Sequence, residues 1–474
     1  MASRTRDAIR AACWTTLFLL GVYLLINGGQ TFISDGEIML QTTARLVDYH
    51  TLTLAEEAAA FPQVVRGQGG FLFSPYGVGQ PLAAGALYAF GTYVLGMHLL
   101  PGALPYNVGR FCALLLPAIA TALTGGMLAF WGARLYQSLR IGVLVALLYG
   151  LGTLALPYSR FFFSEPLFTC CLVLAGLAIA LRSPWGMLLA GLVLGYAVAT
   201  RIAGVFVLPA FVLYAWLVGQ RLKGLVLVGV GLVPGAVLVL LNNWIRFRAI
   251  FERGYEGQGF TGNFFEGLAG LLFSPGKSVL LYVPLLLALP LAVWPFARRC
   301  KAEAVLIGAL TLVILIYSSL WWIWWGGWGW GPRFLVPLMP FLILPLGILL
   351  GTQWRWLVLV LFVLSLAVNA LGILVDFNVY LSEVTQGSQE REAIYLYNPA
   401  FSPIVAHLQR LEWQQVPIVS FQLSRSDIGF PEPVATYISF GIVALTVGAL
   451  LMLGRLLWRA TPQPNDVAAC ATLR

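Results

Sequence analysis

Residues 224–241 read GLVLVGVGLVPGAVLVLL, an apolar run without a single charged side chain. An α-helix rises about 1.5 Å per residue, so a run of this length nearly matches the hydrocarbon core of a bilayer. Similar runs recur along the chain, which has 474 residues, of which 59% are hydrophobic and only 10% charged. Soluble proteins average about 25% charged residues. These values exclude a water-soluble globule and predict an all-α, polytopic membrane protein.

Twelve segments carry the signal of a membrane-spanning helix. We expect them at residues 11–27, 109–131, 141–158, 166–181, 186–200, 203–219, 224–241, 278–297, 303–322, 334–350, 356–374 and 435–454. The first is expected to stay in place as an uncleaved helix, because no small-residue cleavage site follows Asn27. No repeat or linker divides the chain, so we predict one membrane-embedded domain, 1–474, with outer loops 28–108, 242–277 and 375–434.

The charges between these segments predict the topology. With the N-terminus in the cytoplasm, the cytoplasmic side holds 15 of the Lys and Arg residues but only 3 of the Asp and Glu residues, as the positive-inside rule requires. We therefore expect an integral plasma (inner) membrane protein with both termini cytoplasmic. The apolar segment 78–97 would be a thirteenth span, but counting it reverses every later loop, so we expect it to lie along the outer interface. The net charge of +9 then reflects topology rather than nucleic-acid binding.

Two carboxylates follow the first span in the stretch ISDGEI, residues 33–38. Asp35 and Glu37 would lie at the outer membrane surface, where a partly shielded carboxylate can act as a general base or bind a divalent cation. The chain has three dispersed histidines, and its six cysteines all fall in spans or on the cytoplasmic side, so no His/Cys metal cage is available. Oxygen ligands for a metal stay open.

Further charges flank the apolar segments on the same side. Arg160 and Glu165 border three phenylalanines in YSRFFFSEP, residues 158–166, and Arg201 separates two spans. Such charges are costly at membrane depth unless they are paired or used, so a structural ion pair and a site for an anionic lipid head group both stay open. The basic and aromatic residues of loop 242–277, which ends at Lys277, would suit a lipid phosphate.

The most distinctive stretch is WWIWWGGWGWGPRF, residues 321–334, with six tryptophans in ten residues. An interfacial aromatic belt accounts for some of them. It does not account for the glycines, which let the backbone approach a ligand closely, or for Arg333. Because flat aromatic faces also suit sugar rings, we favour a carbohydrate or lipid-phosphate pocket here.

In this order the motifs resemble those of the GT-C superfamily of polyprenyl-phosphate-sugar-dependent glycosyltransferases, the class of the protein O-mannosyltransferases and the lipid A aminoarabinose transferase. The matching positions are Asp35-Gly36-Glu37, SPYGVGQPL at 74–82, Tyr158-Ser159-Arg160 with Glu165-Pro166, Thr200-Arg201, SPGK at 274–277, and WGPRF at 330–334. The resemblance implies a GT-C-like bundle of about twelve transmembrane helices with juxtamembrane helices on the outer face. It also implies an inverting enzyme that transfers a sugar from a polyprenyl-phosphate donor to the hydroxyl of a glycan, lipid or protein in the cell envelope.

By this resemblance Asp35 is the general base, and Glu37 and Glu165 orient the acceptor or help to hold a metal. The cations expected at the donor phosphate are Arg160, Arg201, Lys277 and Arg333. The residues expected to line the sugar and lipid pocket are Tyr76, Gln80, Tyr255, Trp328 and Trp330. No cofactor is required, although a divalent cation, Mg or Mn, at Asp35 and Glu165 stays open.

The sequence departs from the family at two positions. Gly36 separates Asp35 from Glu37, whereas the O-mannosyltransferases have adjacent acids. Gln80 and Pro81 stand where related enzymes often carry a Lys beside a proline pair. A neutral glutamine cannot neutralise a phosphate, so that role falls on the other cations.

Three other functions compete with this interpretation. A flippase or transporter of lipid-linked sugars also carries intramembrane charges, but transporters place them near the bilayer midplane and show paired halves. Here the acids gather on the outer face and no repeat is evident. A non-catalytic scaffold would not need aligned acids and cations. Among enzymes, an O-antigen-ligase-like protein uses a similar donor, but the Asp-Gly-Glu stretch favours the first function.

Overall fold

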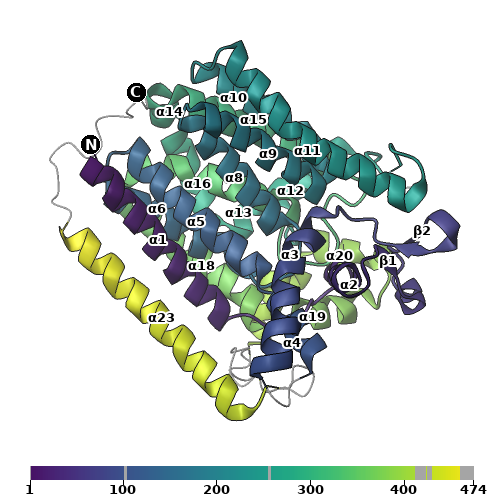
Figure 1. Ribbon diagram of the computed structural model, residues 1–474. Coiled ribbons are helices and arrows are strands. Elements are labelled where there is room, and N and C mark those ends of the chain that lie inside the picture. The colour runs from purple at the N-terminus through teal and green to yellow at the C-terminus, as the bar shows by residue number, and fades with distance from the viewer. Residues whose placement is uncertain are drawn as a thin grey trace.

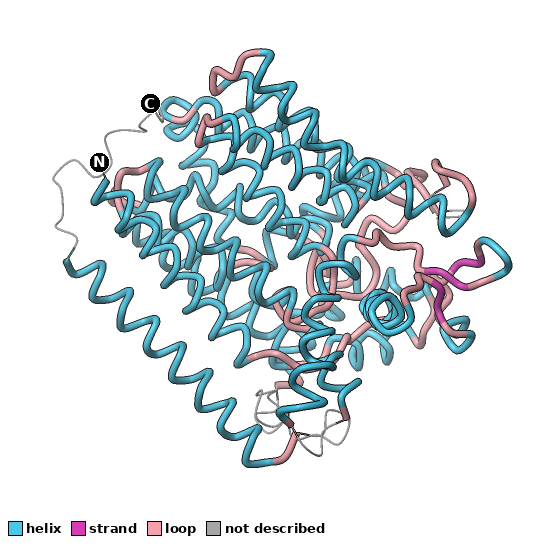
Figure 2. The backbone as a smooth tube through the Cα atoms, viewed as in Figure 1, coloured by secondary structure: helices cyan, strands magenta, loops and turns pink. Residues whose placement is uncertain are grey.

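The computed structural model describes residues 2–100, 104–252, 254, 258–411, 423 and 430–459. Over these residues the protein is a bundle of helices, joined by short loops (Figure 2). The start of α1 (Ala2–Leu25) and the end of α23 (Glu432–Arg459) lie at the same end of the bundle (Figure 1). The all-α prediction is confirmed, and the shared end agrees with an even number of crossings.

The elements of the first half are α2 (Ser34–Tyr49), η1 (Glu56–Ala60), η2 (Gln68–Gly70), α3 (Gly79–Ala89), the π-helix η3 (Phe90–Leu99), α4 (Pro105–Ala113), α5 (Leu116–Leu135), α6 (Leu139–Gly152), α7 (Ala155–Tyr158), α8 (Glu165–Ala180), α9 (Pro184–Thr200), η4 (Ile202–Val207), α10 (Leu208–Leu217) and α11 (Leu222–Phe247). Those of the second half are α12 (Phe264–Phe273), α13 (Val279–Tyr282), η5 (Pro284–Ala288), α14 (Leu289–Arg299), α15 (Lys301–Leu320), η6 (Arg333–Leu338), α16 (Met339–Ile343), η7 (Leu344–Leu346), α17 (Gly347–Leu350), α18 (Arg355–Leu374), α19 (Phe377–Thr385), η8 (Gln389–Arg391), α20 (Glu392–Tyr397), η9 (Pro399–Phe401) and α21 (Pro403–Gln409).

Seven helical stretches among the described residues are long and apolar enough to cross a membrane: Thr5–Leu25, Pro105–Leu135, Leu222–Phe247, Lys301–Leu320, Arg333–Gly351, Arg355–Leu374 and Glu432–Arg459. Shorter apolar helices follow at Leu139–Gly152, Glu165–Ala180, Pro184–Thr200, Ile202–Leu217 and Phe264–Phe273. With the composition given above, these helices make the chain an integral membrane protein.

Prolines explain why several predicted spans are broken rather than continuous. The span expected at 278–297 consists of α13, η5 and α14, and the span at 334–350 consists of η6, α16, η7 and α17. Proline lacks the N–H that an α-helix needs and shifts the backbone into short 3-10 turns. Pro284 opens η5, Pro340 lies in the first turn of α16, and Pro345 lies in η7.

The run that opened the sequence analysis, now α11, packs along α9 through glycines. A Cβ atom at Gly231 would lie 2.8 Å from the Cα of Gly191, and one at Gly235 would lie 2.4 Å from the Cα of Gly195. Because both pairs repeat every four residues, they fall on one face of each helix, and the two backbones touch. Close approach over small residues is a common way for helices to associate in a membrane.

The end of the bundle opposite the start of α1 carries the shorter elements, and we call it the α2 end (Figure 1). It includes a small antiparallel sheet of three two-residue strands, β1 (Thr53–Leu54), β2 (Val65–Arg66) and β3 (Leu72–Phe73), in the order β1-β3-β2. Thr53 and Val65 both pair with Phe73. The segment 78–97 forms α3 and most of η3, which pack on α2 and α4. Its position along the outer interface stays a prediction.

Candidate active site

The predicted base and one predicted phosphate ligand meet at the α2 end. Asp35 lies in the first turn of α2, where a negative charge is favourable beside the helix N-terminus. Its Oδ2 atom lies 2.9 Å from Nη1 of Arg333, the first residue of η6. Each side chain is only 14% exposed. The fold thus brings together two residues that are 298 positions apart in the sequence.

A second ion pair lies beside the first. Glu165, at the start of α8, pairs with Nη1 of Arg201, which follows α9. The ring of Phe334 connects the two pairs, because its centroid is 5.3 Å from the guanidinium carbon of Arg333 and 5.7 Å from that of Arg201. Arg333 also interacts electrostatically with Glu165. We call these four charged side chains the paired cluster.

Some donors and acceptors in the paired cluster are unused. Nε of Arg333 and Oε2 of Glu165 are buried without a hydrogen-bond partner, and buried polar atoms in this state usually signal a missing partner. The ring of Phe163 lies 4.7 Å from the Arg333 guanidinium carbon. The cluster therefore combines cations, carboxylates and aromatic faces with unused hydrogen-bonding capacity.

Glu37 has a different partner, which the sequence analysis missed. Its two oxygens accept hydrogen bonds of 3.0 and 2.7 Å from Nη2 of Arg110 on α4, and Thr31 and Gln41 donate to them as well. Burial alone would raise the pKa of the Glu37 carboxyl, but these donors outweigh it and leave that pKa below its ordinary value. Arg110 lies inside a predicted span, and a charge in such a place could have suggested its role. Glu37 is thus held as a bound anion beside the cluster.

Arg160 and Lys277 are buried, and their contacts are to the protein backbone. Arg160 is 4% exposed, donates to the carbonyl of Ile373 at 2.7 Å and lies over the ring of Phe32. Lys277 is 1% exposed. Its Nζ donates to the carbonyls of Gly327, Gly329 and Gly331 at 3.0, 2.9 and 3.2 Å. A lysine has three donors, so all of those of Lys277 are occupied.

The pKa of Lys277 is lowered to about 7, chiefly because burial penalises its charged form; Glu392 opposes this shift and Arg333 adds to it. The three carbonyl oxygens favour the ammonium form, which alone supplies three hydrogen-bond donors. Lys277 therefore acts on the backbone of the tryptophan-rich stretch, whereas the sequence predicted a direct role at the phosphate.

The tryptophan-rich stretch forms an irregular loop, residues 321–332, that ends at Arg333. Gly326, Gly327 and Gly331 have positive φ angles of 74°, 65° and 64°, which only glycine adopts without strain. The glycines that suggested close approach to a ligand are thus required by the path of the loop itself.

Glu392, the first residue of α20, anchors this loop and was not found from the sequence. Its carboxylate accepts hydrogen bonds from Nε1 of Trp325, from Nε1 of Trp328 at 3.1 Å and from the hydroxyl of Tyr395 at 3.3 Å. Burial raises the pKa of Glu392, and these donors together with Lys277 limit the rise. Nothing in the sequence around Glu392 signals its contact with the loop, because Trp325 and Trp328 lie more than 60 positions away.

The expected pocket residues are dispersed. Trp330 is fully buried, with its ring centroid 5.1 Å from that of Tyr282 and 4.6 Å from that of His407, so it fills the interior and offers no face to a sugar. Gln80 is also fully buried and donates to the carbonyl of Phe163 at 3.3 Å.

Trp328 is half-buried, and Tyr76 is half-buried within electrostatic range of Arg333. Of the expected pocket residues, Tyr76 is thus partly accessible near the cluster, whereas the hydrogen-bond partner of Trp328 is Glu392. Tyr255 lies outside the described residues.

The donor set does not suit a divalent cation. Among the described residues no group of three or more His, Cys, Asp or Glu side chains could hold a metal ion. Asp35 and Glu165, the pair considered from the sequence, each contact an arginine. A guanidinium beside each carboxylate would repel a second cation.

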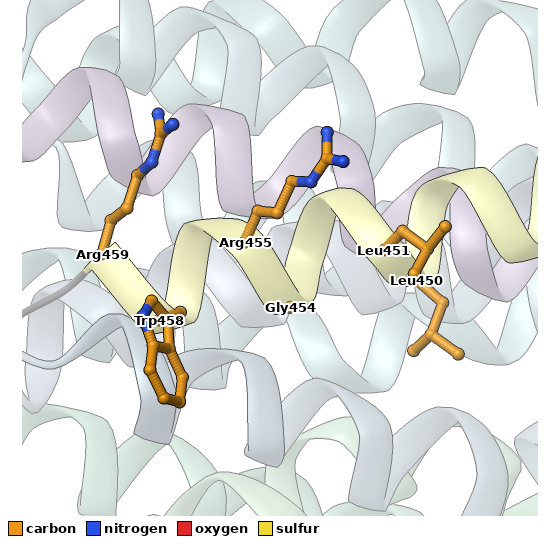
Figure 3. A pocket seen from close by; sticks show the side chains of 6 residues that line it. All are labelled: Leu450, Leu451, Gly454, Arg455, Trp458 and Arg459. Atoms are coloured by element: carbon orange, nitrogen blue, oxygen red, sulfur yellow. The ribbon is translucent and has the colours of Figure 1, made fainter.

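One surface pocket lies at the opposite end of the bundle. It is lined by Leu450, Leu451, Gly454, Arg455, Trp458 and Arg459 at the end of α23. Figure 3 shows Arg455 and Arg459 one turn apart and pointing to the same side, away from Trp458. This pocket is separate from the paired cluster, whose Asp35 belongs to α2, at the other end of the bundle (Figure 1).

No protein-family model matches this chain, and no curated protein matches it by sequence. Two crystal structures of ArnT from Cupriavidus metallidurans are similar to it in structure. The one bound to undecaprenyl phosphate is 14% identical, covers 98% of this chain and 74% of that protein, and gives a TM-score of 0.49. The apo structure is 13% identical, covers 100% and 75%, and gives a TM-score of 0.46. Identities this low assign no activity to this chain.

Proposed function

We propose that this chain is an inverting glycosyltransferase of the GT-C type, which moves a sugar from a polyprenyl-phosphate donor to an acceptor hydroxyl at the outer face of the plasma membrane. The main support is the contact between Asp35 and Arg333. A carboxylate that can accept a proton lies 2.9 Å from a guanidinium that can bind a phosphate. Both residues belong to an integral membrane protein, which can reach a donor that is carried on a membrane lipid.

In the proposed reaction, Asp35 takes the proton of the acceptor hydroxyl, and the oxygen attacks the anomeric carbon of the sugar. The bond between that carbon and the phosphate oxygen breaks on the opposite face, so the configuration inverts. Polyprenyl phosphate leaves with the bonding electron pair, and the proton passes from Asp35 to solvent. Positive charge fixed at the leaving phosphate stabilises the transition state more than the ground state.

The ion pair between Asp35 and Arg333 implies that the donor binds before Asp35 acts as a base. Oδ2 of Asp35 is occupied by Nη1 of Arg333, so that oxygen is not available to an acceptor hydroxyl in this arrangement. A donor phosphate would compete for Arg333, since arginine binds phosphate through two parallel hydrogen bonds. Donor binding would therefore release Asp35 for the acceptor, which couples the base to the presence of its substrate.

Arg201 is the second cation that could face the phosphate. It shares Phe334 with Arg333, and its side chain is 18% exposed, whereas that of its partner Glu165 is 2% exposed. The ion pair with the buried Glu165 keeps Arg201 beside Arg333. Arg160 and Lys277, whose hydrogen bonds go to backbone carbonyls, act on the shape of the site. No step of the proposal requires a metal.

The test is transfer of radiolabelled sugar from a panel of polyprenyl-phosphate sugars by purified protein in liposomes. Wild type should consume one donor, and the donor consumed identifies the sugar. Asp35→Asn should lose turnover by about 10²- to 10⁴-fold, the usual contribution of a general base, while Glu57→Gln, an exposed acid on the loop after α2, should keep wild-type activity. Movement of lipid across the bilayer without consumption of any donor would support the flippase and overturn the enzyme.

A further inference from the structure

The loop that carries Arg333 to the paired cluster has no regular secondary structure between α15 and η6. A side chain that must meet a phosphate within hydrogen-bond distance needs a fixed backbone. Trp324 and Trp330 are buried against neighbouring helices, and the position of Arg333 depends as well on the polar contacts that hold residues 321–332.

Two buried charges from other parts of the chain supply those contacts. Lys277, which precedes α13, binds the carbonyls of Gly327, Gly329 and Gly331. Glu392, on α20, binds the indole N–H groups of Trp325 and Trp328. One charge thus holds the backbone of the loop and the other holds its side chains.

The two charges also stabilise one another. Lys277 and Glu392 attract one another electrostatically, whereas Lys277 and Arg333 repel one another. A buried carboxylate is costly unless it is paired and hydrogen-bonded, and Glu392, at 5% exposed, takes two of its three hydrogen bonds within the described residues from Trp325 and Trp328. These two bonds favour the loop arrangement in which Arg333 reaches Asp35.

We propose that Glu392 is a positioning residue for donor binding, which fixes Arg333 at the lipid phosphate by holding Trp325 and Trp328. This inference rests on the proposed function. It makes the segment after α18 part of the donor site without contact to the donor itself. Glu392 belongs to residues 375–411, whose short helices pack at the α2 end (Figure 1). Through Trp325 and Trp328 it controls the position of Arg333, about 60 positions earlier in the chain.

The experiment compares Glu392→Ala, Glu392→Gln and Glu390→Ala in full-length protein. The readouts are the donor KM, kcat and the Kd for polyprenyl phosphate alone. Loss of Glu392 should raise the KM and Kd by about tenfold, the size expected for lost hydrogen bonds to a charged group, and leave kcat within about twofold. Gln keeps one acceptor oxygen, whereas the two indoles donate to different oxygens of Glu392, so it should restore only part of the affinity. Glu390 is exposed, and its variant should behave as wild type.

A second variant tests the route through the indole. Trp328→Phe removes one N–H donor, so it should weaken donor binding in wild type but add little in Glu392→Ala, because the two changes break one interaction. Additive effects, or an unchanged Kd in Glu392→Ala, would overturn the positioning role.

A spectroscopic readout separates this inference from the proposed function. In protein labelled with 5-fluorotryptophan, Trp328→Phe assigns the ¹⁹F signal of Trp328, and Glu392→Ala should shift or broaden that signal, because Trp328 donates to Glu392. If wild type neither transfers sugar nor binds polyprenyl phosphate, the proposed function fails, whereas an unchanged ¹⁹F spectrum in Glu392→Ala would contradict the anchoring of the loop by itself.

Discussion

At the scale of single residues, we expect substitutions of Arg333 and of Asp35 to change donor binding in different ways. Arg333→Ala removes the charge that meets the phosphate, so the donor Kd should rise by about 10- to 100-fold, as for a lost charge-assisted hydrogen bond. Asp35→Asn should leave that Kd equal or lower, because Arg333 is then free of its carboxylate partner. Binding of polyprenyl phosphate to the purified variants measures both.

Arg66→Ala is the control for this comparison, because Arg66 is an exposed arginine whose ion-pair partner, Glu56, is also on the surface. It should bind the donor as wild type does. If Arg333→Ala bound polyprenyl phosphate with the wild-type Kd, Arg333 would not be a phosphate ligand.

Glu37 permits a prediction about pH. Its pKa is lowered in the folded protein, so the carboxylate stabilises the fold above its ordinary pKa, about 4.3, and this stabilisation is lost as the pH falls through the lower folded value. Glu37→Gln should lower Tm at pH 7, by an amount equivalent to about 1–3 kcal/mol for the charged hydrogen bonds. The difference from wild type should shrink below about pH 4. A pH-independent difference in thermal unfolding would show that the charge of Glu37 is not what stabilises the fold.

Residue types in the sequence singled out charged side chains as candidates for the site but did not predict what they touch. Asp35 and Arg333 were predicted as base and phosphate ligand, and the fold brings them together. Lys277 was predicted at the phosphate, yet its acceptors are carbonyls some 50 positions further along the chain. Every residue has a carbonyl, so no pattern marks the ones that a buried lysine will bind.

At the scale of elements, the contact between α9 and α11 predicts opposite effects for two neighbouring glycines. Gly231→Ala would put a Cβ atom 2.4 Å from the carbonyl oxygen of Leu188, whereas Gly229→Ala meets nothing within 4 Å. Crowding costs about 1–3 kcal/mol, and alanine favours a helix over glycine by about 1 kcal/mol. Gly231→Ala should therefore lower Tm and Gly229→Ala should hold or raise it, in thermal unfolding of detergent-solubilised protein. Equal shifts for both would contradict the close contact.

Hydropathy placed seven of the twelve expected spans on described helices that are long and apolar enough to cross a membrane, because the length of an apolar run is a direct physical requirement of the bilayer. It did not predict the strands β1 to β3, because two residues are too short for an alternating pattern to emerge. The short helices of segment 375–411 depend on contacts with the loop 321–332 and with α18, which no local signal contains.

At the scale of the whole molecule, the topology decides which side of the membrane the paired cluster faces. The connection between α5 and α6 lies at the end of the bundle where α1 starts, and Asp35 lies at the other end (Figure 1). Gln137, in that connection, and Glu57, in the loop after α2, are both exposed. The charge distribution predicts that Gln137 is cytoplasmic and that Glu57 is outside.

Single cysteines at these two positions test the orientation, in a background with Cys13, an exposed free cysteine, changed to serine. A membrane-impermeant maleimide should label Glu57→Cys in intact cells and Gln137→Cys only after the membrane is opened. The parent without either cysteine gives the background. The reverse pattern would move the paired cluster to the cytoplasmic face, where the base and its arginine could still act but only on a donor exposed on the inner leaflet. Labelling of both from outside would contradict the single crossing, Pro105–Leu135, that separates the two positions in this topology.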